Sequence, residues 1–511
     1  MMTAQERKDF RRVQKSRAVW KKRAVRRGED HRRLRERRKE VDSSREAWRE
    51  RALAAEHRTR QLEIEHHQLK SALAQTSQPT PIDTPPFFFS YFVLHLVFNC
   101  TLSFRASSKV LRSFQLVGAG VIFWVPHFTT GIGWALRVGF HGLQQAQRPL
   151  DEQWVCIADV TIQIGSKKAL MVLRVPVSAF SLGKALTLKQ VEVIGLSLGE
   201  TWNGDRVNTV LRSLFERCGW PSHVVSDCGS DIKKGIVETL LEAPNRASWI
   251  SDVSHCVANA LKHYYAKLTL FEQFQSLCTR LRHRLQQTKF AFLLPPKARA
   301  KGRFLSVSRQ AQWGLRTSTY LEGKEREDSP EAAALAQALR GLKPLKMFLT
   351  TFVRNTTCVH EVMRIVKTQG LSAASIHACQ ERLGDLPARS PIRTEVSQYL
   401  QRSVPVVALS DSPLLGSSDV IESLIGKAKQ RLESNGRSEL NKSILLIPCM
   451  CGDLTQDLVA EALATVRVQD VTSWVSENVG DTLQSKRRRE FPRSQAQKPG
   501  TEIADPLADT G

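Results

Sequence analysis

The sequence predicts an α/β core built on a mixed sheet, with an all-α basic region before it and a mostly helical insertion within it. Short apolar runs rich in β-branched residues alternate with helical patterns over residues 150–265. Residues 266–412 have helical periodicity almost throughout. The formal net charge of the 511-residue chain is +25, and residues 1–60 hold 22 Lys or Arg against 10 Asp or Glu. This basic composition favours a polyanionic partner, most commonly nucleic acid.

Residues 1–75 predict one long basic helix, because they contain almost no Pro or Gly. Apolar residues at seven-residue intervals predict a weak coiled coil, most plausible from about residue 48 onward. These positions are Leu34, Val41, Trp48, Ala55, Leu62 and Leu69. A DNA-binding arm with a self-association helix fits this pattern, and so does a solvated helix without a partner. A linker rich in Thr and Pro follows over residues 76–86.

Residues 87–148 predict three short helices, at Phe87–Phe98, Ser103–Leu116 and about Thr129–Leu143. Ser103 and Thr129 or Thr130 are suitable N-caps. We interpret the segment as a helix-turn-helix-like DNA-binding domain, although a small helical bundle without a DNA role gives the same pattern. The side chains predicted to contact DNA are Arg105, Lys109, Arg112 and Arg137.

An aspartate stands inside the apolar β-rich run that opens the core, WVCIADVTIQIGSKK. Burying the carboxylate of Asp159 is costly unless a positive group or a metal ion meets it. A carboxylate that caps the strand end or accepts from nearby backbone N–H groups is the structural alternative. Strands at about 169–176 and 191–198 and a helix over Gly204–Cys218 follow.

A second aspartate, Asp227, follows the predicted strand Ser222–Ser226 in the string VVSDCGSDI. We place Asp159 and Asp227 at the ends of two strands, and the carboxyl ends of adjacent parallel strands lie side by side where ligands bind. Asp231 is a competing second acid. Asp252 comes close after a further predicted strand, and the helix that begins at His255 follows it.

The string GSSDVIESLIGKAKQRLE, residues 416–433, predicts a capped helix with an apolar face. Glu422 stands close to that face, Lys427 is nearby, and Lys429 lies two turns beyond Glu422 on the same side. Such a helix can supply a metal ligand and a phosphate contact together, whereas an ordinary amphipathic helix is the alternative. Residues 413–480 complete the core with an extension, and residues 481–511 predict a basic, disordered tail.

Two-metal phosphodiester chemistry requires carboxylates that hold two Mg²⁺ ions roughly 4 Å apart. Two acids on sheet strands and one on a packed helix meet this requirement. The strings IADVT, SDCGSD and IESLIGKAK resemble the DDE triad of RNase H-like transposases from bacterial insertion sequences. The resemblance covers about residues 150–265 and 416–435, with 266–412 as a helical insertion before the third acid.

The resemblance implies an RNase H-like core whose catalytic and metal-binding residues are Asp159, Asp227 and Glu422. It also implies two Mg²⁺ ions, with Mn²⁺ as a substitute, DNA contacts from Lys427 and Lys429, and His255 beside the site. The long gap between Asp227 and Glu422 departs from the retroviral-integrase type, so Asp252 stays a competing third ligand.

The implied activity is that of a DNA transposase, which cleaves transposon 3′ ends and joins them to target DNA as a homo-oligomer. A DNA-binding protein with an inactive core and a structure-specific nuclease of the same fold are the alternatives. We expect a cytoplasmic protein, because the N-terminus is charged from Glu6 onward and the ten cysteines are scattered. The resemblance implies that it is bacterial and nucleoid-associated. No membrane partner is expected, since Phe87–Phe98 is too short to span a bilayer.

Overall fold

The computed structural model divides the chain into two compact units, residues 1–84 with 108–125 and residues 85–107 with 126–511. It describes residues 28, 42, 44, 46, 48–66, 68, 87–117, 124–180, 183–297, 303–324, 330–432 and 439–491. In the first unit, residues 48–66 are helical and almost entirely exposed, including Trp48 and Leu62 of the predicted heptad. Leu34, Val41, Leu69 and the linker over 76–86 lie outside the described residues.

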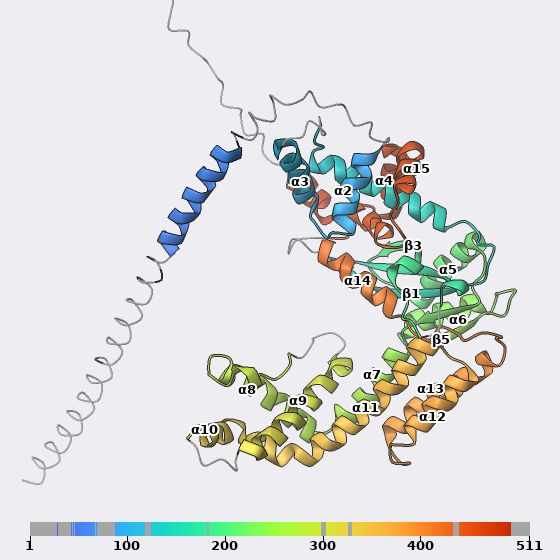
Figure 1. Cartoon of the computed structure of the whole chain (residues 1–511). Coiled ribbons are helices and arrows are strands. Elements are labelled where there is room, and N and C mark those ends of the chain that lie inside the picture. The colour runs from blue at the N-terminus through green and yellow to red at the C-terminus, as the bar shows by residue number, and fades with distance from the viewer. Residues whose placement is uncertain are drawn as a thin grey trace, which may run out of the picture. The chain divides into compact units, whose positions relative to one another are not determined.

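Five strands of the second unit form one mixed sheet with the order β3-β2-β1-β4-β5 (Figure 1). β1, β2 and β3 pair antiparallel, whereas β4 runs parallel to β1 and β5 runs parallel to β4. The strands are β1 Trp154–Ile164, β2 Lys167–Pro176, β3 Glu192–Gly199, β4 His223–Ser226 and β5 Ser248–Ser251. The predicted mixed sheet is therefore confirmed.

The strand β1 does not end at Asp159, contrary to the prediction. It continues to Ile164 after an irregular register between Asp159 and Ile162. The residues beyond Asp159 extend the antiparallel pairing with β2 through the turn at Gly165, where φ is +70°. Only the parallel pairing with β4 stops beside Asp159, because its last register pair is Ala158 with Ser226.

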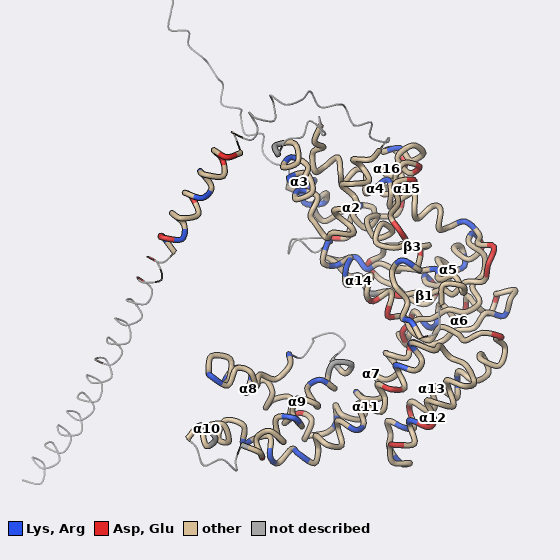
Figure 2. The backbone as a smooth tube through the Cα atoms, viewed as in Figure 1, with Lys and Arg blue, Asp and Glu red and all other residues tan. Residues whose placement is uncertain are grey.

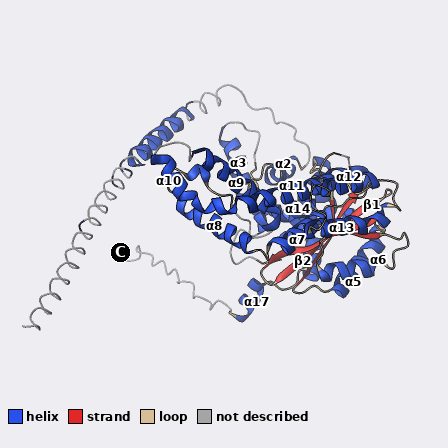
Figure 3. Ribbon diagram, turned by 90° about the horizontal axis from the view of Figure 1, so that it is seen from below, coloured by secondary structure: helices blue, strands red, loops and turns tan. Residues whose placement is uncertain are grey.

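Helices cover both faces of the sheet, and the side chains of β1 alternate between two apolar cores. α5 Gly204–Cys218 and α6 Ser230–Leu240 cover the face to which Cys156 and Ala158 point. α4 Phe128–Ala146, α7 Val253–Tyr265 and α14 Asp419–Leu432 share the core of Ile157. Figure 3 shows α5 and α6 on one side of the strands and α14 on the other. By the same alternation Asp159 lies on the α14 side.

The predicted insertion is mostly helical, as expected. Its core is aromatic: the rings of Tyr265 and Phe352 lie 4.4 Å apart, and Phe274 packs edge-on against Phe352. Figure 1 shows α8, α9 and α10 grouped near one end of the long helix α11, away from the sheet. The helices are α8 Thr269–Leu285, α9 Arg303–Lys324, α10 Pro330–Leu339, α11 Lys346–Gln369, α12 Ala373–Leu383 and α13 Pro391–Val407.

The segment 87–148 forms the three predicted helices, α2 Phe88–Phe98, α3 Phe104–Val117 and α4. Ser103 caps α3 by accepting from Ala106 N at 3.1 Å, whereas α4 is capped by His127 instead of Thr129 or Thr130. Helix α4 belongs to the same core as the sheet. At Gly139 its backbone approaches the Leu445 carbonyl so closely that a Cβ atom would lie 1.7 Å from that oxygen.

The described residues of the C-terminal part, 439–491, include the helices α15 Gln456–Thr465, α16 Val468–Asn478 and α17 Leu483–Glu490. Helix α17 falls inside the predicted disordered tail, and residues 492–511 lie outside the described residues. None of the described helices combines the length and the apolar character needed to cross a membrane. The short 3₁₀ helices are η1 Val177–Ala179, η2 Leu188–Gln190, η3 Ala291–Leu293, η4 Arg340–Leu345, η5 Lys442–Leu446 and η6 Pro448–Met450.

Candidate active site

Asp159 and Asp227 are the residues that directly follow a register pair on adjacent parallel strands. Ala158 of β1 pairs with Ser226 of β4, and the residue that follows each of them in the chain is an aspartate. Asp159 is buried, with 7% of its surface exposed. Asp227 is half-buried, and its Oδ1 accepts a hydrogen bond from Gly229 N at 3.1 Å at the start of α6. Two carboxylates distant in sequence are thus brought to one point of the sheet.

Asp252 is fully buried and caps helix α7. Its Oδ1 accepts from His255 N at 2.8 Å and from the imidazole Nδ1 of His255 at 3.1 Å. Its Oδ2 accepts from Ser418 N at 2.5 Å, in the segment that leads into α14. Its own backbone N–H donates to the Ser226 carbonyl at 2.8 Å. Asp252 therefore joins the end of β4, the start of α7 and the start of α14.

The pKa of the Asp252 carboxyl lies below its usual value. Burial by itself raises this pKa, but the hydrogen bonds from His255 and from Ser418 N–H, with the charge of the imidazolium, outweigh burial. The carboxylate is consequently charged although water does not reach it.

His255 lies between Asp252 and Glu422. Its Nδ1 is 3.1 Å from Asp252 Oδ1 and 3.8 Å from Glu422 Oε1. The hydrogen bond with Asp252 raises the pKa of His255 to about 9; burial opposes the rise, and the charges of Asp252, Glu422 and Asp227 add to it. The imidazolium therefore stands among three of the predicted acids, and we expected it only beside the site.

Glu422 belongs to the first turn of α14, and 44% of its side chain is exposed. Burial raises the pKa of the Glu422 carboxyl, the His255 charge lowers it, and the charges of Asp252 and Asp419 raise it further. Helix α14 packs beside β1 (Figure 1). The third predicted acid thus comes from a helix on the face of the sheet to which Asp159 points.

Two residues that hold the start of α14 were missed by the sequence analysis. Lys367 of α11 forms an ion pair with Asp419 at 2.6 Å, and Ser254 of α7 donates to the same carboxylate at 3.0 Å. Ser254 could have been found through its proximity to Asp252 in the sequence. The sequence around Lys367 does not indicate this role, because 51 residues separate Lys367 from its partner Asp419.

The acids fit a Mg²⁺ ion bound by two carboxylates more closely than one bound by three. Within the described ranges, no three His, Cys, Asp or Glu side chains are close enough together to hold one ion. Mg²⁺ is commonly held by one or two carboxylates, and water and substrate phosphates complete its octahedral shell. Asp159 and Asp227 supply two hard oxygen donors of this kind.

The predicted DNA-binding residues of α14 differ in their exposure. Lys427 is exposed, and Lys429 is half-buried two turns beyond Glu422. At the end of the same helix Arg431 donates to the Val97 carbonyl and lies 5.1 Å from the centre of the Phe98 ring. Helix α14 is therefore held at both ends, and Lys427 faces solvent between them.

The predicted DNA-binding residues of the segment 87–148 lie in different surroundings. Arg105 is exposed and its guanidinium lies 4.3 Å from the centre of the Phe128 ring. Lys109 and Arg112 are exposed residues of the first unit. Arg137 donates from Nε to the Val466 carbonyl at 2.7 Å and from Nη2 to the Leu463 carbonyl at 2.5 Å. A phosphate contact by Arg137 would require these two bonds at the end of α15 to break.

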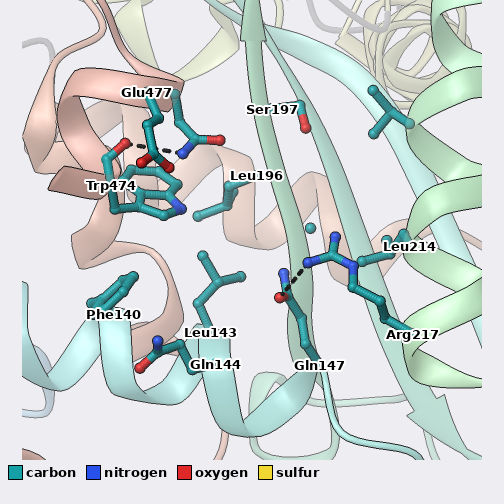
Figure 4. Close-up of a pocket in the computed structure, with 13 residues that line it drawn as sticks. Phe140, Leu143, Gln144, Gln147, Leu196, Ser197, Leu214, Arg217, Trp474 and Glu477 are labelled. Atoms are coloured by element: carbon teal, nitrogen blue, oxygen red, sulfur yellow. Dashed lines mark hydrogen bonds between the residues drawn. The ribbon is translucent and has the colours of Figure 1, made fainter. Parts of the chain in front are cut away.

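A cavity of about 330 Å³ lies at the outer edge of β3, between α4, α5 and α16 (Figure 4). Arg217 Nη1 donates to Gln147 Oε1 at 3.0 Å, and Figure 4 shows the ring of Trp474 across from that pair. Its lining residues are Phe140, Leu143, Gln144, Gln147, Gly195, Leu196, Ser197, Val210, Leu214, Arg217, Trp474, Glu477 and Asn478. The predicted acids are not among them, so the cavity is separate from the candidate active site.

The stabilising contribution of His255 is expected to depend on pH. Its folded-state pKa of about 9 exceeds the usual value of 6.5, so its contribution is complete below pH 6.5 and is lost as the pH rises through 9. Urea unfolding of the wild type and of His255→Gln, without divalent ions, should show a stability difference that shrinks from pH 6 to pH 9.5. A difference that stays constant over this range would contradict the contact with Asp252.

Comparison with known proteins gives distant structural likeness alone. No family model matches the chain, and no curated protein matches it. A structure described as the Drosophila P element transposase strand transfer complex is 13% identical, with an alignment that covers 80% of this chain and 98% of that chain at a TM-score of 0.38. At this TM-score the likeness adds no argument about the activity.

Proposed function

We propose that the chain is a DNA transposase with an RNase H-like core, which cleaves the 3′ ends of its element and joins them to target DNA. One observation supports this above all others: Asp159 and Asp227 directly follow the register pair Ala158 and Ser226, on adjacent parallel strands. Their sequence strings resemble those of DDE transposases, and the helix with the third matching string packs beside β1.

Asp159 and Asp227 are the residues that would hold Mg²⁺. Glu422 would be the third ligand only if its carboxylate moved toward them, because the three acids are not grouped closely enough in the described structure to share one ion. When bound, Mg²⁺ stabilises the charge on the attacking and leaving oxygens of phosphodiester chemistry. Glu422 is a better candidate than Asp252, because its side chain is half-exposed whereas both Asp252 oxygens already accept hydrogen bonds in a buried position. Asp252 and His255 instead fix where α14 begins and where the Glu422 carboxylate stands.

The basic residues beside the acids would bind the DNA backbone. Lys427 is exposed on the same helix as Glu422, and Lys429 follows that acid by two turns. Charge-assisted contacts from such side chains fix the register of a duplex without reading its sequence. We propose DNA as the partner and a homo-oligomer as the working assembly, as the resemblance implies.

The direct test is cleavage and joining of DNA by the full chain. Overlapping duplexes from the DNA on both sides of the gene would be incubated with Mg²⁺, with Mn²⁺ and with EDTA. We expect metal-dependent cleavage at a 3′ end in the duplexes that contain an element terminus, and joined products when target DNA is added. Cleavage without joined products would replace the transposase by a nuclease, and no cleavage by folded protein that binds an end would refute both.

A DNA-binding protein with an inactive core is the second candidate. It is favoured by the observation that no three acids among the described residues approach one another closely enough to hold one ion. Calorimetric titration with Mg²⁺ in the presence of end DNA separates the two. Heat of binding that disappears in Asp159→Asn supports the enzyme, whereas tight DNA binding without any Mg²⁺ binding supports the inactive protein.

A further inference from the structure

The first part of the helical insertion has a strong excess of positive charge. Residues 267–316 contain eleven Lys or Arg and a single acid, Glu272. The equally long stretch 358–407 contains six Lys or Arg and four Asp or Glu. The two stretches are both helical parts of the same insertion, so the excess in the first is not a general property of its helices. A local excess of this size attracts polyanions.

Four of the basic side chains of this stretch are exposed on two helices. Arg280 and Arg284 are one turn apart on α8, and Arg309 and Arg316 are two turns apart on α9; all four are exposed. The other exposed residues on these faces are mostly neutral hydrogen-bonding groups, namely Gln273, Ser276, Gln312 and Thr319. In Figure 2 Lys and Arg positions recur along α8, α9 and α11.

No carboxylate in the described part of the chain neutralises the four arginines. None of Arg280, Arg284, Arg309 and Arg316 forms an ion pair with any residue that the structure describes. Elsewhere the pattern differs, since Arg174 pairs with Glu192, Arg212 with Glu242 and Arg364 with Glu361. Four guanidinium groups without a carboxylate leave their donors for an external anion.

Helices α8 and α9 hold these arginines on a fixed scaffold. Gln275 of α8 donates to Gln310 of α9 at 2.9 Å, and Trp313 of α9 donates to the Leu293 carbonyl at 3.1 Å. Arg282, which lies between Arg280 and Arg284 in the sequence, donates to the Pro295 carbonyl at 2.7 Å and so ties Pro295 to α8. Phe274 packs beneath, 3.0 Å from the position of a Cβ at Gly314. The charges are thus presented at set positions instead of on a free segment.

We propose that the exposed faces of α8 and α9 that carry Arg280, Arg284, Arg309 and Arg316, together called the α8–α9 surface, bind the phosphate backbone of duplex DNA without reading its sequence. The choice of DNA among polyanions rests on the proposed transposase function. The basic helical faces with neutral Gln, Ser and Thr between the arginines suit phosphate oxygens, which accept from both kinds of group. The surface is separate from Lys427 and Lys429, which lie on α14.

The test compares two quadruple variants of the full chain in EDTA, with a random-sequence DNA duplex as the probe. R280Q/R284Q/R309Q/R316Q removes the α8–α9 charges, and R364Q/R382Q/R389Q/R402Q removes four exposed charges from the balanced stretch. Each phosphate contact contributes about 0.9 to the slope of log K against log salt concentration. We expect the first variant to lower that slope by about 3 to 4, and the second to leave it within about 1 of the wild type. Circular dichroism and thermal unfolding verify that both variants fold.

A third variant tests the charge itself: R280K/R284K/R309K/R316K should restore most of the wild-type slope, because lysine keeps the positive charge. Equal slopes for the wild type and the glutamine variant would overturn the proposal. A single-stranded RNA bound at least about ten times more tightly than the duplex would overturn DNA as the partner. The binding measurement does not require cleavage. If the wild type does not cleave DNA but the salt slope still falls in the glutamine variant, the transposase proposal is refuted and the α8–α9 surface is supported.

Discussion

Asp159→Asn and Asp227→Asn are each expected to lower the rate of Mg²⁺-dependent 3′-end cleavage by about a thousandfold or more, with little change in DNA binding. Each substitution keeps the shape of the side chain but removes a charge that would hold the metal, and the loss of several kcal/mol of transition-state stabilisation corresponds to such a factor. Asp231→Asn is the matched control, because Asp231 is an exposed carboxylate in the first turn of α6, close to Asp227 in sequence. Equal loss in all three variants would contradict a specific role for Asp159 and Asp227.

The same assay separates the two candidates for the third acid. Glu422→Gln should abolish cleavage with an unchanged unfolding temperature, because the side chain is half-exposed and its nearest cationic atom is 3.8 Å away. Asp252→Asn should chiefly lower stability, because it weakens a buried acceptor of bonds from His255 and Ser418. If Glu422→Gln cleaves normally while folded Asp252→Asn does not, Asp252 replaces Glu422 as the third ligand.

The sequence sufficed for those parts of the fold that depend on local pattern. The helix predicted over Gly204–Cys218 has the observed bounds of α5, because Asn203 caps it and Gly219 follows it. The strand before Asp227 was likewise predicted from its apolar run and the turn after it. The end of the first strand was wrong, since the pairing of residues beyond Asp159 with β2 depends on a partner strand and not on composition.

The surroundings of the candidate site could be predicted only in part. Motif strings indicated Asp159, Asp227 and Glu422, but not the imidazolium between Asp252 and Glu422, whose position depends on how α7 meets α14. The ion pair of Lys367 with Asp419 joins two helices that are distant in sequence. The hydrophobic periodicity of a sequence does not indicate an ion pair of this kind. The DNA-binding prediction for Arg137 illustrates the same limit, because its guanidinium donates hydrogen bonds to two backbone carbonyls near the end of α15.

Gly139→Ala is expected to destabilise the protein by more than about 3 kcal/mol, at the upper end of the cost of overpacking. The added Cβ would lie 1.7 Å from the Leu445 carbonyl oxygen and 2.9 Å from its carbon. These are backbone atoms of η5, so they cannot rotate away as a side chain would. Helix α4 would have to move from the core that it shares with the sheet, and the variant should show a lower urea midpoint or fail to accumulate in folded form.

Gly142→Ala, three residues further along α4, provides the matched control with the opposite expected sign. Its Cβ would meet Pro448 Cβ at 3.6 Å, an ordinary contact, and alanine in place of a helical glycine stabilises by about 0.4–1 kcal/mol. Both variants replace a glycine of α4 by alanine, so the difference between their urea midpoints excludes the gain in helix propensity that they share. A Gly139→Ala variant as stable as Gly142→Ala would show that α4 does not pack on η5 as described. The difference between the two therefore tests whether residues 128–146 are part of the α/β core or of a separate DNA-binding domain.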